Sequence, residues 1–233
     1  MKVEIWSDVV CPWCYIGKRR FEAALARFEH RDQVEVEWKS FELDPTSSGG
    51  GTGSYAERLA VKYGTDVPRA QEMLDQMTAA AAVEGLDLRF DLASPANTFD
   101  AHQVIHLAGL RGVQDDVKER LLLAYFTQGA AVGDRAELAR LAAEAGLDAD
   151  EVTPALAGQT YAEDVRRDEE QARAFGITGV PFFVIDRAYG VSGAQPADAL
   201  LQVLDQAWAA SHPTLVMAGG TDDAACGPQG CEI

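Results

Sequence analysis

The chain has 233 residues, of which 47% are hydrophobic, and its formal net charge is −17 at pH 7. This length suits one large domain or a small domain with a sizeable insertion, and the apolar content supports a core that needs no disulfide. The acidic balance argues against nucleic acid and anionic membranes as partners, because both attract clustered Lys and Arg.

Nothing in the sequence predicts a membrane segment or a secretory leader. No apolar run is long enough to cross a bilayer, and the opening MKVEIWSDVV is too short and too acidic for a signal peptide. We therefore expect a cytoplasmic protein. Close cysteine pairs in that compartment are more often catalytic or metal-binding than structural.

The first 46 residues have the pattern of a β-α-β unit. Residues 3–10 (VEIWSDVV) predict a buried strand, and a helix with apolar residues at helical spacing follows from Pro12. Residues 34–43 (VEVEWKSFEL) alternate as a second strand does. Such a crossover connection predicts two parallel strands.

A long helical stretch follows this unit. SSGGGTGS (47–54) predicts a flexible loop. The chain is then rich in Ala, Leu, Glu and Arg, and helices are expected at 55–63, 68–84, 98–111, 115–129, 134–145, 149–157 and 159–175. Strand character returns at 180–186 and 188–194, before a helix at 196–210.

The predicted organisation is therefore an α/β domain split by an all-helical insertion. Residues 1–46 and 176–210 form the two parts of the domain, and residues 47–175 form the insertion. Residues 211–233 are Gly-rich and predict a loose C-terminal tail.

Two cysteines bracket Pro12 and Trp13 in SDVVCPWCYIG (7–17). Cys11 lies where the first helix begins, and a helix N-terminus stabilises a thiolate and lowers its pKa. Cys14 lies one turn later on the same face, within reach of a disulfide. This spacing predicts Cys11 as an exposed nucleophile that forms a mixed disulfide with a substrate, and Cys14 as the resolving thiol.

Two other interpretations of this pair compete with the redox couple. A fixed structural disulfide across one helical turn would close a short loop and contribute little stability. Half of a zinc site stays open as an alternative, because CxxC is also the usual spacing of zinc ligands.

Five stretches resemble the DsbA family of thioredoxin-like thiol–disulfide oxidoreductases, and more narrowly its FrnE-like branch. They are IWSDVVCPWCYIGKRRFE (5–22), WKSFELDP (38–45), NTFDAH (97–102), FGITGVPFFVID (175–186) and YGVSGAQP (189–196). The resemblance implies a thioredoxin-like fold interrupted by the helical insertion. It also implies oxidoreductase or disulfide isomerase activity on protein thiols, with no prosthetic cofactor and with electrons from cellular thiols.

The same resemblance implies further site residues. It implies a cis bond between Val180 and Pro181, which would shape a substrate groove together with Pro12 and Trp13 of the motif. Periplasmic members usually carry His where this chain has Trp13, and Trp supplies no charge. We therefore expect the helix terminus to contribute most of the stabilisation of the thiolate, the couple to be less oxidising, and reductase or isomerase activity to be favoured.

The segment NTFDAH lies over the active-site cleft in this resemblance, so that Asn97 or His102 would contact substrate or the Cys11 thiolate. Asn97 is equally suited to cap the helix that follows. His102 and His106 are one helical turn apart, but no third ligand accompanies them, so we expect no metal. Near the strand ends, Asp8 or Glu42 could accept a proton from Cys14, although solvation at the surface is the simpler expectation.

A second pair, Cys226 and Cys231, lies in CGPQGC near the C-terminus. Three interpretations stay open. The pair could be an auxiliary redox couple that exchanges with Cys11 and Cys14, or an isolated oxidisable tail. In the third interpretation all four cysteines bind one zinc ion.

Protein or peptide thiols and disulfides are the expected substrates, with a reductase partner or glutathione as the electron source. A homodimer is compatible with the surface of the insertion. One alternative function is that of a glutathione-linked isomerase or transferase of the kappa type, whose members typically have Ser in place of the first cysteine. Another is a binding protein that a zinc ion held by four cysteines stabilises.

Overall fold

The computed structural model describes residues 1–51 and 53–213. Cys226 and Cys231, with nearly all of the predicted tail, lie outside the described residues. Within the described part of the chain, no helix has both the length and the apolar character that crossing a bilayer requires.

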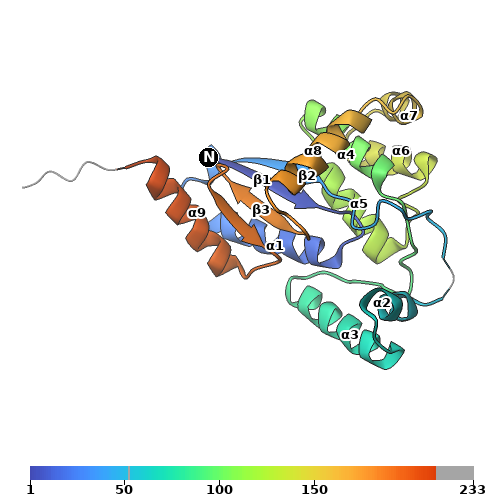
Figure 1. Cartoon of the computed structure of the whole chain (residues 1–233). Coiled ribbons are helices and arrows are strands. Elements are labelled where there is room, and N and C mark those ends of the chain that lie inside the picture. Colours follow the sequence, from blue (N-terminus) through green and yellow to red (C-terminus); the bar gives the residue numbers. More distant parts are fainter. Residues whose placement is uncertain (52, 214–233) are drawn as a thin grey trace, which may run out of the picture.

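A four-stranded mixed sheet with the order β2-β1-β3-β4 lies at the centre of the molecule (Figure 1). The parallel pairing of β1 (Lys2–Ser7) with β2 (Glu35–Ser40) confirms the predicted β-α-β unit. Antiparallel pairing joins β3 (Phe182–Ile185) to β1 and to β4 (Tyr189–Ser192). The first strand is shorter than predicted, because the backbone turns at Asp8, whose carbonyl oxygen accepts a hydrogen bond from the Cys11 N–H.

Alternating side chains of the sheet fill two cores. Val3 and Ile5 face the main core, where Phe21 of the first helix stacks on Phe183. Trp6 points to the other face, where it joins a smaller cluster with Val184. Period-two alternation in a strand thus covers both faces of the sheet with apolar side chains.

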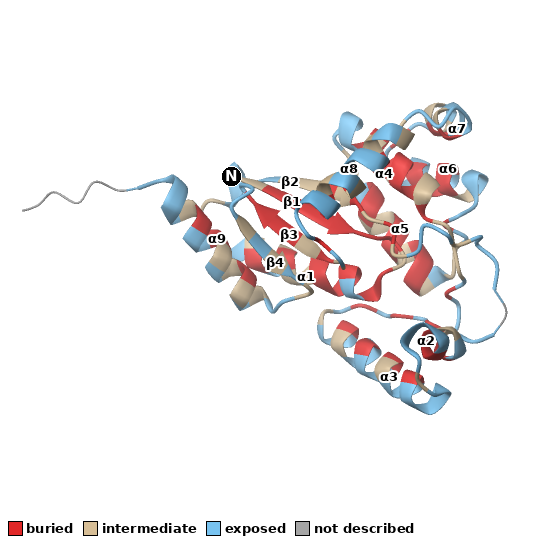
Figure 2. Ribbon diagram, viewed as in Figure 1, coloured by how far each residue is buried: buried red, intermediate tan, exposed pale blue. Residues whose placement is uncertain are grey.

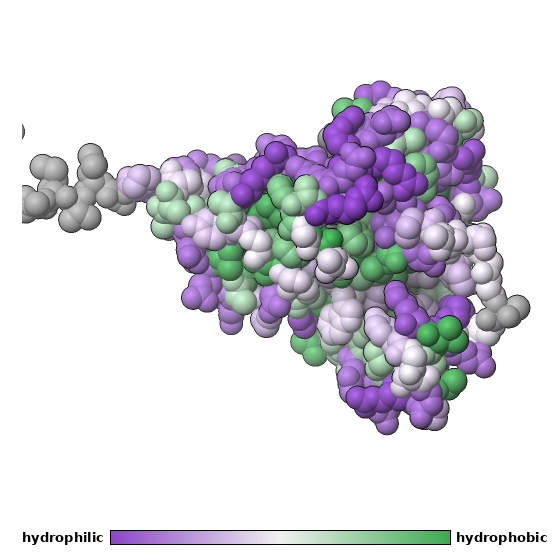
Figure 3. Space-filling view, in the orientation of Figure 1, coloured by the Kyte–Doolittle hydropathy of each residue, from purple (hydrophilic) through white to green (hydrophobic). Residues whose placement is uncertain are grey.

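Two helices flank the sheet close to its strands. They are α1 (Pro12–Arg27) and α9 (Ala197–Ser211), which pack against each other. A short 3-10 helix, η1 (Arg31–Gln33), precedes β2. On the face seen in Figure 3, apolar residues gather over the middle of the molecule, while hydrophilic residues cover most of the surrounding helices.

The insertion between β2 and β3 has seven helices in the part of the chain that the structure describes. They are α2 (Tyr55–Tyr63), α3 (Val67–Val83), α4 (Phe99–Arg111), α5 (Gln114–Gln128), α6 (Arg135–Glu144), α7 (Ala149–Ala157) and α8 (Ala162–Ala174). Figure 1 shows α2 and α3 as a hairpin set apart from the group α4–α8, and Figure 2 shows buried residues on one side of each hairpin helix. The predicted class, α/β with a helical insertion, is confirmed.

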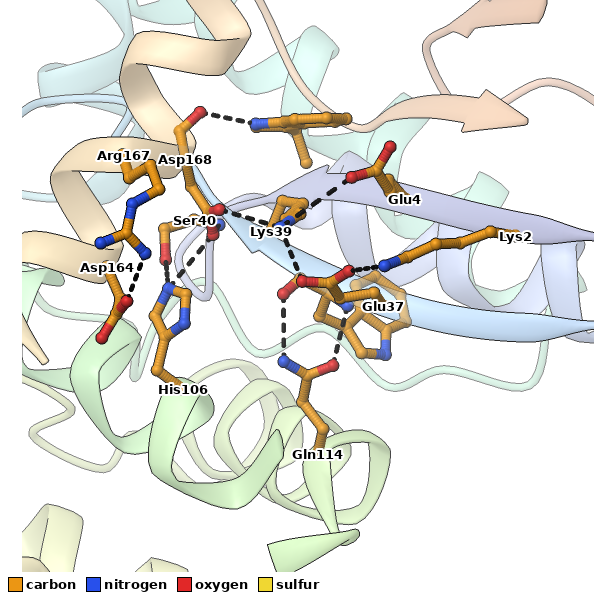
Figure 4. A network of polar contacts seen from close by, with 12 residues as sticks. Lys2, Glu4, Glu37, Lys39, Ser40, His106, Gln114, Asp164, Arg167 and Asp168 are labelled. Carbon is orange, nitrogen blue, oxygen red and sulfur yellow. Dashed lines mark hydrogen bonds and ion pairs between the residues drawn. The ribbon is translucent and has the colours of Figure 1, made fainter. Parts of the chain in front are cut away.

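A polar network joins the insertion to the sheet (Figure 4). The Asp168 carboxylate on α8 accepts a hydrogen bond from the Ser40 N–H at 2.9 Å and lies 3.1 Å from both Lys39 Nζ and His106 Nε2. Trp6 Nε1 donates to the Asp168 carbonyl oxygen at 2.9 Å. Buried polar groups are stable only when they are paired, so these contacts hold α8 and α4 against β2.

Candidate active site

Cys11 occupies the N-cap of α1, and Pro12 is the first residue of that helix. Proline suits this position because the first helical N–H groups have no partner within the helix. The Cys11 carbonyl oxygen accepts hydrogen bonds from the Cys14 and Tyr15 N–H groups, at 3.1 and 3.3 Å. Both cysteines therefore belong to the first turn of α1, as the motif predicted.

The two cysteines are free thiols and differ in access. Cys11 is 4% exposed and Cys14 is fully buried, whereas Trp13 between them is 40% exposed. The prediction of an exposed Cys11 is wrong in this respect, because the neighbouring loop covers its side chain. Cys11 nevertheless lines a cavity that opens to solvent, and Cys14 does not line it.

The loop that covers Cys11 carries Val180 and Pro181, whose peptide bond is cis, as the resemblance implied. Cys11 Sγ lies 3.6 Å from the Val180 carbonyl oxygen, within hydrogen-bond reach of a thiol. A Cβ atom added at Gly17 of α1 would lie 2.8 Å from Pro181 Cγ. Glycine at position 17 therefore lets the proline loop lie directly against the helix.

The two thiols titrate together. The hydrogen bond between their side chains, together with burial, raises the pKa of Cys11 well above its ordinary value. Burial opposes ionisation of Cys14 too, but the hydrogen bond from Cys11 and the charge of Lys118 outweigh it and lower the pKa of Cys14. The lowered pKa that the sequence predicts for Cys11 is therefore not found in the reduced protein. When the pair loses its first proton, the remaining proton is shared between the two sulfurs.

A cluster of buried polar side chains lies behind the cysteines. Asp8 and His102 are buried, and Asp8 Oδ1 lies 3.3 Å from His102 Nε2. Asp8 Oδ2 accepts a hydrogen bond from the Leu43 N–H at 2.8 Å. The expectation that Asp8 is solvated at the surface is wrong, because His102 and the Leu43 N–H pair its carboxylate inside the protein.

His102 and Asn97 do not line the cavity beside Cys11. His102 faces Asp8, and its link to the cysteines passes through that carboxylate. Asn97 Oδ1 accepts from the Phe99 N–H at 3.0 Å, and its amide donates to the Ser47 carbonyl oxygen at 3.1 Å. Asn97 is therefore not the N-cap that its sequence position suggested, because the N-cap of α4 is Thr98; its side chain instead closes the turn that leads into the helix.

Glu42 is also buried, against the expectation of a solvated carboxylate. One of its oxygens accepts from Arg166 at 2.7 Å, and the other has no hydrogen-bond partner among the described residues. Burial, assisted by the neighbouring Glu169, raises the pKa of Glu42 to about 7. Neither its local sequence nor its place near a strand end signals this environment.

Lys118 is the residue that sequence reasoning missed. It lies on α5, is 1% exposed, and donates to the Ser7 carbonyl oxygen at 3.4 Å. Burial lowers the pKa of Lys118 to about 8, although the charges of Cys14, Asp8 and Cys11 oppose the change. No local signal distinguishes this lysine from the surface lysines of a helix.

A cavity of about 400 Å³ lies between the motif and the α2–α3 hairpin. Its walls include Cys11, Trp13 and Val180 on one side, and apolar and aromatic side chains of the hairpin on the other: Tyr55, Leu59, Tyr63, Met73 and Met77. Arg58 and Lys62 add positive charge. The carboxylates of Asp8 and Asp44 line the same cavity, so it offers an apolar surface with charges of both signs beside Cys11.

No group of three or more His, Cys, Asp or Glu side chains is arranged to hold a metal ion in the described ranges, 1–51 and 53–213. Cys226 and Cys231 lie outside those ranges. Their predicted roles as an auxiliary couple or as zinc ligands stay predictions.

Comparisons with known proteins agree with this geometry. A probable DsbA oxidoreductase from Streptomyces coelicolor is 47% identical, with a TM-score of 0.86 over 100% of this chain and 99% of that one. The uncharacterized protein YwbO of Bacillus subtilis is 31% identical over 186 residues, which are 78% of this chain and 86% of that protein.

The cytosolic disulfide reductase DsbM of Pseudomonas aeruginosa, solved with glutathione, shares the fold at 17% identity. Its TM-score is 0.61 over 88% of this chain and 98% of DsbM. The DSBA-like thioredoxin domain matches residues 2–205. With its sheet, its helical insertion and its motif at the start of α1, the chain belongs to the DsbA-like thioredoxin domain family.

Proposed function

We propose that this protein is a cytoplasmic thiol–disulfide oxidoreductase or disulfide isomerase of the FrnE-like branch, acting on protein thiols through Cys11 and Cys14. The observation that carries the proposal is the position of Cys11. It lies at the N-cap of α1, lines the cavity, and is 3.6 Å from the carbonyl oxygen of Val180.

The reduction of a substrate disulfide takes two exchanges. In the reduced pair the pKa of Cys14 is the lower one, so the shared proton first passes from Cys11 to Cys14. The Cys11 thiolate then attacks one substrate sulfur, a mixed disulfide forms, and the first substrate thiolate leaves. Cys14 then loses its proton and attacks Cys11 Sγ, which releases the second substrate thiolate and leaves a Cys11–Cys14 disulfide. The substrate gains two electrons from the protein, and cellular thiols then reduce the Cys11–Cys14 disulfide. Oxidation of a substrate runs the same steps in reverse.

Trp13, Val180 and the cavity support polypeptide as the substrate. An exposed indole beside the reactive sulfur offers an apolar contact, and exposed apolar surface often marks a binding site. Pro12 begins α1, and Pro181 lies directly against Gly17 of the same helix, so both prolines are placed to shape the groove beside Cys11. Glutathione is a second candidate ligand, because Arg58 and Lys62 add positive charge to the cavity and DsbM was solved with glutathione.

A redox titration tests the proposal. The purified protein is equilibrated in glutathione buffers, its free thiols are alkylated, and the peptide with Cys11 and Cys14 is weighed, with zinc measured on the same sample. We expect that peptide to titrate as a two-electron couple in metal-free protein. Cysteines that do not titrate, together with one zinc ion per chain, would refute the proposal and support the zinc-binding alternative.

A trapping experiment assigns the roles of the two thiols. We expect Cys14→Ser to accumulate a mixed disulfide with a scrambled protein substrate, and Cys11→Ser to form none. The reverse pattern would show that Cys14 is the attacking sulfur.

The same peptide maps report whether Cys226 and Cys231 form an auxiliary couple, as we also propose. A glutathione-dependent isomerisation of a small aromatic substrate would instead support the kappa-type alternative.

A further inference from the structure

Lys118 is a buried lysine of the helical insertion, and its ammonium has a single hydrogen-bond partner among the described residues. Its side chain comes from α5, more than 100 residues after the motif, and is 1% exposed. An ammonium has three donors, and the hydrogen bond of Lys118 among the described residues goes to the Ser7 carbonyl oxygen at 3.4 Å. The Trp38 ring lies against it, with 5.6 Å from Nζ to the ring centroid.

A second buried lysine beside the same ring shows what a structural role looks like. Lys18 Nζ is 5.9 Å from the Trp38 centroid, and its side chain is 2% exposed. Three carboxylates surround Lys18, those of Glu22, Asp115 and Glu119. Its charge is therefore compensated within the protein, as buried charges require.

The charges that face Lys118 are those of the site itself. Cys14, Asp8 and Cys11 act to keep it protonated, and Lys18 opposes them. The Asp8 carboxylate already has His102 and the Leu43 N–H as hydrogen-bond partners. A thiolate on the cysteine pair is the remaining anion that an ammonium in this position can stabilise.

We propose that Lys118 is a positioning residue for the redox couple: its buried charge stabilises the thiolate that Cys11 and Cys14 share, and the helical insertion thereby sets the reduction potential. The proposal rests on the proposed function. It revises the expectation that the helix terminus contributes most of the stabilisation of the thiolate beside the uncharged Trp13.

The consequence for the redox equilibrium has a definite sign. Stabilising the thiolate stabilises the reduced form, which makes the disulfide a stronger oxidant. The balanced exchange is protein disulfide plus two glutathione thiols giving protein dithiol plus glutathione disulfide. Removal of the ammonium shifts this equilibrium toward the protein disulfide.

The test compares Lys118→Met with Lys18→Met, which also removes a buried ammonium from the Trp38 ring. The measurements are the potential in glutathione buffers at pH 7 and the pH dependence of iodoacetamide alkylation. We expect Lys118→Met to shift the equilibrium at least tenfold toward the disulfide, about 30 mV for a two-electron couple, and to move alkylation to higher pH. Lys18→Met should leave the equilibrium constant and the alkylation rate within about threefold of the wild-type values.

Asp8→Asn should change the redox equilibrium and the pH of alkylation in the opposite direction. Loss of its negative charge should shift the equilibrium toward the dithiol and alkylation to lower pH. Equal potentials in wild type and Lys118→Met, or shifts of the same sign in Lys118→Met and Asp8→Asn, would overturn the proposal. If circular dichroism shows Lys118→Met unfolded, Lys118→Gln with Asp8→Asn decides by the same criteria. A wild-type protein that does not titrate at all refutes the proposed function instead.

Discussion

Glu42 is a single carboxylate whose surroundings favour its neutral form. Burial, with a contribution from Glu169, raises its pKa to about 7, while Arg166 opposes the change. The folded state therefore binds an extra proton between the unfolded pKa near 4.5 and about 7. The free energy of unfolding that Glu42 contributes is present at low pH and is lost as the pH rises through this window.

We expect Glu42→Gln to gain stability over the wild type as the pH rises. The difference in the free energy of unfolding should grow by about 1–3 kcal/mol between pH 5 and pH 8. Denaturant unfolding at both pH values measures it. Glu72→Gln is the control, because Glu72 is exposed and its ion pair among the described residues is with Arg69; a pH-independent difference for Glu42→Gln would contradict the prediction.

The cysteine pair is the other residue-scale feature. Its order of ionisation comes from two thiols in contact beside a buried ammonium, and not from the helix terminus alone. Local sequence places both sulfurs on one face of α1, and that part was predictable. The charge of Lys118, which helps the Cys11 hydrogen bond to lower the pKa of Cys14, comes from α5.

At the scale of elements, α1 and the Val180–Pro181 loop are held together through Gly17. Helix propensity alone predicts that Gly17→Ala stabilises α1 by roughly 0.5–1 kcal/mol. The contact predicts the opposite, since the new methyl group would lie 2.8 Å from Pro181 Cγ. We expect Gly17→Ala to lower the free energy of unfolding, followed by thermal unfolding, by about 1–3 kcal/mol and to slow disulfide exchange.

Gly179→Ala is the matched control. It changes a glycine two residues before Pro181, where an added Cβ meets nothing within 4 Å. Its stability and exchange rate should stay close to those of the wild type. A stabilised Gly17→Ala with normal exchange would show that the loop moves away without cost.

The α2–α3 hairpin forms the far wall of the cavity, so its side chains should affect large substrates more than small ones. We expect Tyr63→Ala to raise KM for a disulfide-bonded peptide about 3- to 10-fold, in line with the ~1 kcal/mol often lost when an exposed aromatic contact is removed. Its reaction with dithiothreitol should not change. Val61 is exposed on the same helix but does not line the cavity. An equal effect of Val61→Ala on KM would contradict the prediction.

For the whole molecule, Asp168 is the point where the insertion is tied to the sheet. Burial opposes its ionisation, but His106, the Ser40 N–H and Lys39 outweigh burial and lower its pKa. The stability that it contributes is therefore present above its ordinary range and is lost as the pH falls through the lowered value.

We expect Asp168→Ala to cost about 1–3 kcal/mol, because it leaves the buried Ser40 N–H without its acceptor and removes one of the carboxylates that pair with Lys39. Its deficit in denaturant unfolding should be larger at pH 7 than at pH 3. Asp164→Ala on the same helix removes a partner of Arg167 alone (Figure 4) and should change stability by less than about 0.5 kcal/mol. Similar costs for the two variants would show that the network does not hold α8.

Sequence alone determined the order of the elements, the parallel β1–β2 pair and the place of Cys11 at the start of α1. These features are local: alternation selects the apolar faces of a strand, and Pro12 is well suited to the first turn of a helix. The buried states of Asp8 and Glu42 were mispredicted, and Lys118 was overlooked. Charged residues are exposed by default, and only the packing of α4, α5 and α8 against the sheet brings partners from distant parts of the chain to bury them.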